Sequence, residues 1–410
     1  MPCLGDSDKL FALIQGETIK ANVISQSTSV VAPITTYGEA RLSELRRVTS
    51  VLGVLLALLC PGCAMYELEQ DLEVIEEIRL DIDGCVQGET SGDHPVLVVL
   101  LREDEEAQWQ VFDYFVQYHP GAFEFLTSGP ARCRVVAFED ANQDFVYQSG
   151  ETAGMSQPAD IRASRADVLI ELRENEGVLD GLPLNLSRSE DSADLAVTRA
   201  NNGVVVPLED ERFHASHGDL GIWEPMEFSR RRLSGIYFLE DYDHGKVPVL
   251  FFHGIGGTPK IFDSMVERLD RERFQPWFVF YPSAHRLDLV TYHLANMIKE
   301  FHARHKFERM AVVAHSMGGL VAGATMQELS KDDHSEYLKS FVTLATPWGG
   351  HPSVRSALEY SPVVAPRWYD LAPGSPFMKG LHAGGLPNSI EAYSLLFCFV
   401  GDSMLMEGCV

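Results

Sequence analysis

The sequence predicts an α/β domain built on a parallel sheet, preceded by a small β-sandwich. Two observations carry this prediction. In residues 221–410, short apolar runs alternate with amphipathic helical patterns, and such alternating units form a parallel sheet with helices on both faces. In residues 80–175, short strand-like runs follow one another without helical patterns between them, which is typical of a sandwich.

The charge of the chain limits its partners. It has 410 residues, with 33 Lys and Arg against 59 Asp and Glu, which gives a formal net charge of −26 at pH 7. Such a surface repels nucleic-acid phosphates and anionic lipid head groups at long range. We therefore expect no nucleic-acid partner, whereas a covalent anchor would still allow attachment to a membrane.

Residues 41–63 have the features of a signal peptide that ends in a lipoprotein cysteine. The apolar run Val48–Leu59 follows three arginines and is shorter than the ~20 residues that a membrane-spanning helix needs. Gly62 and Cys63 resemble the end of a bacterial lipoprotein signal, in which the cysteine carries the lipid. We expect an exported protein, lipid-anchored to the bacterial cell envelope; the alternative is a buried apolar helix. Residues 1–40 show no convincing periodicity and are expected to be a non-native or disordered extension.

Clusters of Gly, Pro, Asp and Ser separate the candidate strands of the sandwich. These strands are Val96–Leu101, Trp109–Tyr118, Ala122–Leu126, Cys133–Phe138 and Ala166–Leu172. Cys85 and Cys133 both flank strands of this domain and could pair in an exported protein. The composition then shifts toward Ser, Asp, Asn and Gly, and we expect residues 176–220 to be a linker.

One loop of the sandwich has the ligand spacing of a calcium site. Asp140, Asn142, Asp144 and Glu151 occupy positions 1, 3, 5 and 12 of an EF-hand-like loop, whose oxygen ligands wrap one Ca²⁺. Phe145 stands at position 6, where Gly usually permits the sharp turn, and no helical pattern flanks the loop. Two interpretations therefore stay open, a structural calcium site and a solvated acidic turn between two strands.

The elements of the second half follow from its apolar patterns. Strands are expected at Val247–Phe252, Trp277–Tyr281, Met310–Ala314, Ser340–Ala345 and Ala392–Val400. Helices are expected after Thr258, from Val290 to Phe301, and over Met317–Leu329. The proline-rich segment Gly349–Asn388 is expected either to cap the site or to be a plain connection that closes the edge of the sheet.

The strand Met310–Ala314 leads through His315 into Ser316 and the next helix. A serine between a strand and a helix, with small residues two positions before and after it, is the pattern of a nucleophile elbow. Ala314 and Gly318 meet this requirement. The strained turn would lift the Ser316 hydroxyl out of the sheet, and we therefore predict that Ser316 is a nucleophile.

A glycine-rich loop follows the first strand of this sheet. It consists of His253, Gly254, Ile255, Gly256 and Gly257. We predict that the amides of Ile255 and Met317 stabilise the oxyanion that forms when Ser316 attacks an ester carbonyl. His253 is expected to orient the loop through its side chain. The glycine spacing fits no dinucleotide fingerprint, and no Lys-Ser/Thr pair follows it, so a phosphate-binding loop is disfavoured.

The motifs His253–Gly257 and Ala314–Gly319 together resemble those of the α/β-hydrolase superfamily, and most closely those of bacterial triacylglycerol lipases. The stretches Gly235–Gly257, Ala345–Gly350 and Asp370–Phe377 also resemble membrane-associated hydrolases of the inositol-deacylating type. This resemblance covers the second half of the chain. It implies a serine hydrolase of the lipase or esterase type that needs no cofactor for catalysis and acts on lipid or other carboxylic esters.

In that superfamily the catalytic acid and then the histidine follow the serine along the chain. Asp402 is the carboxylate just past the expected strand Ala392–Val400, and no histidine follows it. We therefore expect a chain truncated before its last strand, with Asp402 as the candidate acid and His351 and His382 as substitute bases. The alternative function is a catalytically incomplete surface lipoprotein that binds lipid or a protein partner. A peptidase or thioesterase on the same scaffold would show the same motifs.

Overall fold

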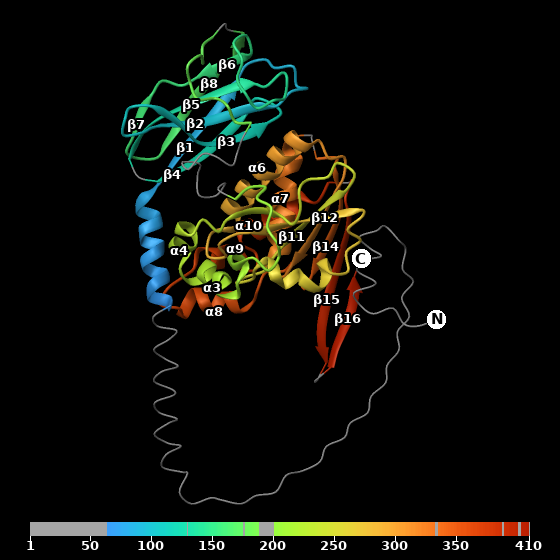
Figure 1. The fold of residues 1–410 in the computed structure, drawn as a ribbon. Coiled ribbons are helices and arrows are strands. Elements are labelled where there is room, and N and C mark those ends of the chain that lie inside the picture. The colour runs from blue at the N-terminus through green and yellow to red at the C-terminus, as the bar shows by residue number, and fades with distance from the viewer. Residues whose placement is uncertain are drawn as a thin grey trace, which may run out of the picture.

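The computed structural model describes residues 64–128, 130–174, 177–187, 201–332, 335–387, 389–400 and 403–409. Residues 1–40, the signal-like segment 41–63 and Asp402 lie outside this set, so their assignments stay predictions. Figure 1 shows an all-β domain above an α/β domain, with a helix over residues 64–78 that runs beside the α/β domain and leads into the first strand. The acidic residues after the signal-like segment thus form a helix.

The all-β domain contains two sheets packed face to face. One has the order β4-β1-β8, and the other has the order β3-β2-β5-β6-β9, with β7 paired to β5. The strands are β1 Arg79–Gln87, β2 Val96–Glu103, β3 Trp109–Gln117, β4 Ala122–Ser128, β5 Ala131–Glu139, β6 Thr152–Met155, β7 Ala159–Ile161, β8 Arg165–Glu171 and β9 Arg173–Glu174. Side chains from both sheets, such as Ile82, Val98 and Phe125, share one buried core. The architecture is that of a sandwich.

The two cysteines of the sandwich are not joined. Cys85 lies on β1 and Cys133 on β5, in different sheets, and both are free thiols. The pairing considered from the sequence is therefore wrong for this structure. Burial raises the pKa of the Cys133 thiol to about 11, so it stays protonated at neutral pH.

Two parts of the segment 176–220, which the composition predicts to be a linker, pack into the domains. Within residues 177–187, Leu179 and Leu184 are buried against the large sheet of the sandwich. Farther along the chain, Phe213 is fully buried in a core of the α/β domain. This packing could not be predicted from the sequence, because many Ser, Asp, Asn and Gly residues surround the few apolar side chains that pack.

The α/β domain is built on a seven-stranded sheet with the order β10-β12-β11-β13-β14-β15-β16. The five inner strands are parallel, and the two edge strands, β10 and β16, run antiparallel to their neighbours. The strands are β10 Gly235–Phe238, β11 Val247–Phe252, β12 Phe274–Phe280, β13 Met310–His315, β14 Leu338–Leu344, β15 Glu391–Val400 and β16 Ser403–Cys409. Apolar cores cover both faces of this sheet, as its continuous apolar strands require.

Helices flank the sheet and gather at the carboxyl ends of its strands. They are α3 Ala215–Trp223, α4 Pro225–Arg230, α5 Asp263–Val266, α6 Leu287–His305, α7 Met317–Leu329, α8 Ser353–Tyr360, α9 Pro366–Leu371 and α10 Pro376–Gly384. One core joins the sheet to α6 and α7, and the opposite core joins it to α4 and α5. None of the described helices combines the length and the apolar character needed to cross a bilayer.

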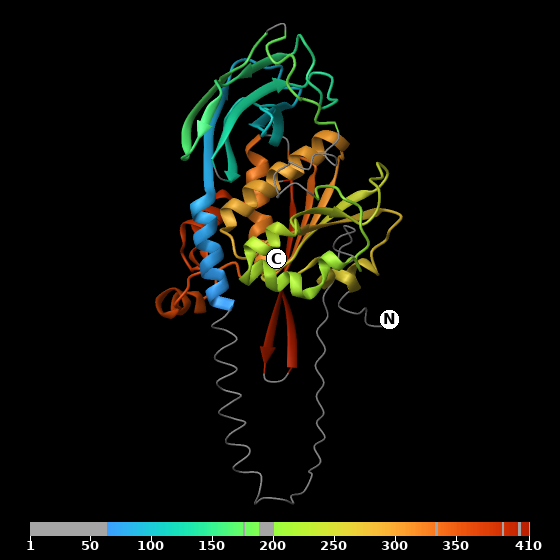
Figure 2. The same ribbon diagram turned by 60° about the vertical axis from the view of Figure 1, so that its left-hand side comes forward.

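The sheet ends in a hairpin that the apolar patterns did not predict. Strand β16 returns antiparallel to β15, from the pair Val400–Ser403 to the pair Ser394–Cys409. Only the first half of β15, up to Leu395, also pairs with β14, and the rest of the hairpin projects beyond the sheet (Figure 2).

The two domains meet along α6. Glu300 and Arg304, one turn apart on this helix, are joined by an ion pair of 2.9 Å, and the Tyr114 hydroxyl on β3 donates to Glu300. Arg304 also donates to the Tyr114 oxygen at 3.0 Å, and its guanidinium lies 3.9 Å from the centre of the Phe145 ring. Because Phe145 belongs to the acidic loop, this network fixes that loop against the α/β domain.

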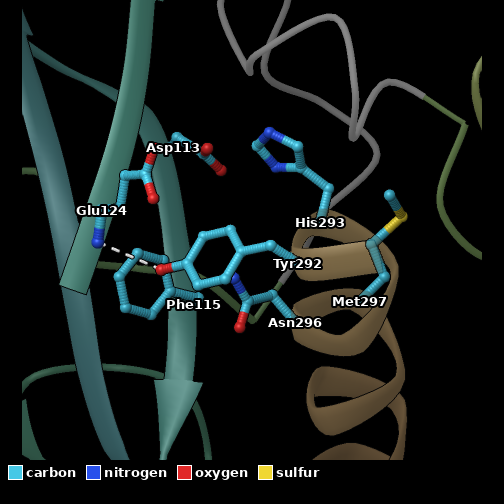
Figure 3. A pocket seen from close by; sticks show the side chains of 7 residues that line it. All are labelled: Asp113, Phe115, Glu124, Tyr292, His293, Asn296 and Met297. Carbon is cyan, nitrogen blue, oxygen red and sulfur yellow. Dashed lines mark hydrogen bonds between the residues drawn. The ribbon is translucent and has the colours of Figure 1, made fainter. Parts of the chain in front are cut away.

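A small polar pocket lies between the same elements (Figure 3). Its lining residues come from β3, β4 and α6 and are Asp113, Phe115, Glu124, Tyr292, His293, Asn296 and Met297. The amide of Glu124 donates to the Tyr292 hydroxyl across it, at 3.0 Å. The pocket therefore belongs to the interface between the domains.

Candidate functional site

Ser316 lies at the turn between β13 and α7, at the carboxyl end of a central strand. Its φ of 54° and ψ of −129° are rarely adopted by residues that carry a side chain, and such strain costs of order 1–3 kcal/mol. Its amide donates to the Leu344 carbonyl at 2.8 Å, and its carbonyl accepts from the Gly319 amide at 3.0 Å. Hydrogen bonds therefore hold the turn from both sides, while the Ser316 side chain stays partly exposed.

Close contact between the turn and the glycine-rich loop requires residues without side chains. A Cβ on Gly318 would lie only 2.4 Å from the carbonyl oxygen of His253. A Cβ on Gly254 would lie 2.8 Å from the Cβ of Ser316. The loop and the serine are thus in contact, and only glycine fits at these two positions.

The loop after β11 is a tight turn that uses two of its own amides. The Gly257 amide donates to the Gly254 carbonyl at 3.1 Å, and the Gly256 amide donates to the Ser283 hydroxyl, also at 3.1 Å. No described residue accepts a hydrogen bond from the amide of Ile255. The turn therefore fixes its own shape and leaves the amide next to Gly254 available.

A second amide is available on the other side of the serine. Met317 is the first residue of α7, and the first amides of a helix have no acceptor within it. No acceptor for the Met317 amide lies among the described residues. The positive end of the α7 dipole also lies here. Gly254 contacts Ser316, and Ile255 and Met317 are the residues that follow these two along the chain.

His253 is buried beneath the loop and holds it in place. Its Nδ1–H donates to the Gly254 carbonyl at 2.7 Å, and its Nε2 accepts from the Tyr281 amide at 3.4 Å. The Tyr281 hydroxyl donates to the His253 carbonyl, and the two rings stack with their centres 4.3 Å apart. Burial lowers the pKa of His253 to about 4, so the ring is neutral. With both ring nitrogens engaged, His253 offers no base to Ser316.

Within the described part of the chain, no histidine ring is hydrogen-bonded to the Ser316 hydroxyl. The Nδ1 atom of His351 lies 2.7 Å from a neighbouring serine hydroxyl, and the Nε2 atom of His382 on α10 lies 2.8 Å from the Trp348 carbonyl. Asp402, the candidate acid, lies outside the described residues. The structure thus brings Ser316 and the glycine-rich loop together, and within the described residues neither substitute base is hydrogen-bonded to Ser316.

Two residues that support the loop, Tyr281 and Ser283, are absent from the sequence-based site. Both come directly after β12, which lies next to β11 in the sheet. Ligand-binding residues in parallel sheets gather beyond the carboxyl ends of neighbouring strands. Their position just after a strand is the signal that the sequence offers. It could not be used, because the sequence does not show that β12 lies next to β11 in the sheet.

The four residues of the predicted calcium loop come together between β5 and β6. Their oxygens accept hydrogen bonds from the loop itself; the Asp140 carboxylate, for example, accepts from the Phe145 amide at 2.9 Å. Phe145 has a φ of 62°, the left-handed conformation that favours Gly at this position. Burial and nearby carboxylates raise the pKa values of Asp140 and Glu151.

The same hydrogen bonds within the loop would also form in an acidic turn that binds no metal ion. Across the described residues there is no group of three or more His, Cys, Asp or Glu side chains placed to hold a metal ion. The ligation of Ca²⁺ by Asp140, Asn142, Asp144 and Glu151 therefore stays a prediction.

The order of the parallel strands, the antiparallel first strand β10 and the strained serine after the central strand together define the fold of the second half. It is an α/β-hydrolase fold. The fold class expected from the two motifs is confirmed. A family model for lecithin:cholesterol acyltransferase matches residues 283–363, a span that contains α6, Ser316 and α7.

Solved structures of similar proteins include three lipolytic enzymes. A lipase from Bacillus licheniformis in its mature form is 19% identical over 38% of this chain and 67% of that one, with a TM-score of 0.31. Lipase B from Aspergillus fumigatus is 18% identical over 39% of each chain, with a TM-score of 0.30. The phospholipase PlaB from Legionella pneumophila is 16% identical over 36% of this chain and 37% of that one, also at 0.30. This chain thus spans less than half the length of the latter two, and no curated protein matches it.

Proposed function

We propose that this chain is a serine hydrolase that cleaves carboxylic esters of lipids, with Ser316 as its nucleophile. The observation that carries the proposal is the position of Ser316. It occupies a strained turn in contact with Gly254, and the amides of the next residues, Ile255 and Met317, have no acceptor among the described residues. Such strain persists where a reactive side chain has to be held out of the core.

In the proposed reaction, the Ser316 Oγ attacks the ester carbonyl carbon while its proton passes to a general base. The carbonyl oxygen becomes an oxyanion, which the amides of Ile255 and Met317 stabilise; loss of one such donor typically lowers kcat by about 10²–10³. The C–O bond to the alcohol then breaks, and the alcohol leaves with the proton from the base. Water hydrolyses the acyl-serine in the same way and restores Ser316.

We assign no general base, because no described histidine is hydrogen-bonded to Ser316. We retain Asp402 as the candidate acid, since it follows β15 directly in the sequence. A serine without its triad keeps only a residual ~10³–10⁴-fold rate over water. The absence of a described histidine bonded to Ser316 favours a second candidate function, a hydrolase fold that binds lipid without cleaving it.

A fluorophosphonate probe distinguishes the two candidates, because it reacts only with an activated serine. We expect the full chain and a Ser330→Ala control, altered at the other end of α7, to be labelled, and Ser316→Ala not to be. If the folded wild-type chain takes up no label but binds phosphatidylcholine vesicles, the lipid-binding function replaces the enzymatic one. Equal labelling of all three proteins would refute the role of Ser316.

The proposal includes export and a lipid anchor at Cys63. Directly after Cys63, the helix over residues 64–78 packs against the α8–α9 connection, where Leu68 lies in one cluster with Val363 and Ala365. This packing supports an anchor that holds the carboxyl ends of the strands close to a membrane. Expression in bacteria with radiolabelled palmitate should label the wild type and not Cys63→Ser; label in both would exclude this anchor.

A further inference from the structure

The helix over residues 64–78 is attached to the α/β domain along one side, next to α4 (Figure 1). Leu68 has an exposed fraction of 1% and lies in one apolar cluster with Ala284, which follows β12. Three residues later, the Asp71 carboxylate accepts a hydrogen bond from the Met226 amide at 2.8 Å. The helix therefore contacts two different parts of the α/β domain, the segment after β12 and the start of α4.

Asp71 caps α4 from a distant part of the chain. Met226 is the second residue of α4, and its amide is one of those that have no acceptor within the helix. Glu224, which directly precedes α4, makes no side-chain hydrogen bond to it. The acceptor that a residue at this position usually supplies therefore comes from Asp71. Since one residue separates α3 from α4, the cap also holds the end of α3.

Helix α3 packs directly on the glycine-rich loop. A Cβ on Gly218 of this helix would lie 2.2 Å from the carbonyl oxygen of Gly256, so the two backbones are in contact. One turn later, Ile222 reaches the same residue, because a Cβ on Gly256 would lie 2.5 Å from the Ile222 Cδ1. At such distances a shift of α3 moves the loop with it. The position of α3 therefore determines the position of Gly256.

A second connection from the same helix ends at the same glycine. Ala284, which shares an apolar cluster with Leu68, donates its amide to the Gly221 carbonyl of α3 at 2.8 Å. The residue before it is Ser283, whose hydroxyl accepts from the Gly256 amide at 3.1 Å. Gly256 is thus held at its carbonyl by α3 and at its amide by Ser283. Both supports lie next to residues that contact the helix.

We propose that the helix over residues 64–78 positions the oxyanion amide of Ile255, with Asp71 and Leu68 as its positioning residues. Gly256 directly follows Ile255, so a displacement of Gly256 also moves the backbone of Ile255. An oxyanion donor has to lie within hydrogen-bond distance of the developing charge, and a misplacement of ~1 Å can lower the rate about 100-fold. This inference rests on the proposed function, because these residues act on the same oxyanion site through other residues. Catalysis then requires that the helix is docked.

Hydrogen exchange of the Gly256 amide tests this connection apart from catalysis. In the full chain, measured by mass spectrometry at residue resolution, Asp71→Ala and Leu68→Ala should each speed this exchange about tenfold or more. The amides of β13 should keep their rates, which excludes a general loss of stability. Asp71→Asn retains an oxygen acceptor and should exchange like the wild type, as should Glu69→Ala, at an exposed position of the same helix. Unchanged exchange of Gly256 in both alanine variants would overturn the inference.

The rate of fluorophosphonate labelling tests the effect on Ser316. A displaced oxyanion donor slows the attack of Ser316, so the labelling rate of Asp71→Ala should fall about tenfold or more, while the final extent of labelling equals that of the wild type. For p-nitrophenyl butyrate, kcat should fall by a similar factor, with KM within about twofold of the wild-type value. Asp71→Asn should restore both rates. A lower extent of labelling at an unchanged rate would indicate loss of folded protein and would refute the positioning role.

The two measurements separate this inference from the proposed function. If the exchange of Gly256 rises in the alanine variants but their labelling rates equal that of the wild type, the positioning role is refuted and the hydrolase function stands. If the wild type takes up no label, the hydrolase function fails. Faster exchange of Gly256 in Asp71→Ala would then still support the connection between the helix and the glycine-rich loop.

Discussion

The interface between the two domains differs from the end of the sheet that holds Ser316. The difference lies in how each region accommodates groups that are unfavourable for stability, such as buried charges and strained backbone. At the interface, Arg304 is paired with Glu300 and bonded to the Tyr114 hydroxyl. At the other end, the Nε and Nη1 atoms of the buried Arg367 have no hydrogen-bond partner among the described residues, and Ser316 has a strained backbone. Proteins remove such costs where only stability is at stake and retain them where a group has to bind or react. Substitutions at the interface should therefore lower stability, and substitutions near Ser316 should lower function.

The largest effect on stability is expected from Arg304→Ala. Glu300 is buried, and the substitution removes the cation that is paired with its carboxylate, so the free energy of unfolding should fall by about 3–5 kcal/mol. Arg271→Ala, which breaks a partly exposed pair with Glu240, should cost less than about 1 kcal/mol. Urea unfolding followed by circular dichroism measures both. Equal losses would show that the interface network is no stronger than a surface pair.

A smaller loss is expected from Gly318→Ala. The new Cβ would lie 2.4 Å from the His253 carbonyl oxygen, and the forced shift of the loop should cost about 1–3 kcal/mol. On the same helix, a Cβ on Gly323 would meet Leu381 and Trp348 at an ordinary 3.4 Å, so Gly323→Ala should gain about 0.5–1 kcal/mol. Thermal unfolding should separate the two variants by sign; the same sign for both would contradict the close contact at Gly318.

Ser316→Gly should raise stability while it removes function. Glycine adopts a φ of 54° with a ψ of −129° without strain, so we expect a net gain of about 1 kcal/mol in the free energy of unfolding. Ser330 follows the same helix in a right-handed conformation, and Ser330→Gly should instead lose a few tenths of a kcal/mol. If Ser316→Gly is the less stable of the two, the turn is not strained.

The smallest change is expected from Arg367→Leu. No ion pair of Arg367 is seen among the described residues, so replacing this buried cation with an apolar side chain should leave the free energy of unfolding unchanged or raise it by up to about 1 kcal/mol. Arg304→Leu, the same substitution at the paired arginine, serves as the matched variant and should lose several kcal/mol. A similar loss at both positions would mean that Arg367 has partners in the protein and that the contrast between the two regions is false.

The sequence predicted those parts of the α/β domain that local patterns encode. Strands β11 to β15 are apolar runs or nearly so, and each was placed within a few residues. Ser316 and the His253–Gly257 loop were found because a strand, a turn and small residues adjoin along the chain. The edge strands β10 and β16 were missed, since the first is only four residues long and the second forms a hairpin rather than a crossover.

The rest depends on contacts between distant segments, which no local pattern shows. In the sequence, residues 64–78 look like an acidic stretch, because only one side of the helix that they form packs on the α/β domain. Arg367 gives no sign in the sequence that its side chain is buried, with no hydrogen-bond partner for its Nε and Nη1 atoms among the described residues. Likewise, the contact between Phe145 and Arg304 joins the two domains and became visible only in the structure.

The central claim is that Ser316 reacts at a point where the amides of Ile255 and Met317 can hold a developing oxyanion. A crystal structure of the full chain after reaction with a p-nitrophenyl alkylphosphonate tests this claim most directly. We predict phosphorus bonded to the Ser316 Oγ and a phosphoryl oxygen about 3 Å from both amide nitrogens. An adduct on another residue, or a phosphoryl oxygen turned away from both amides, would contradict the account.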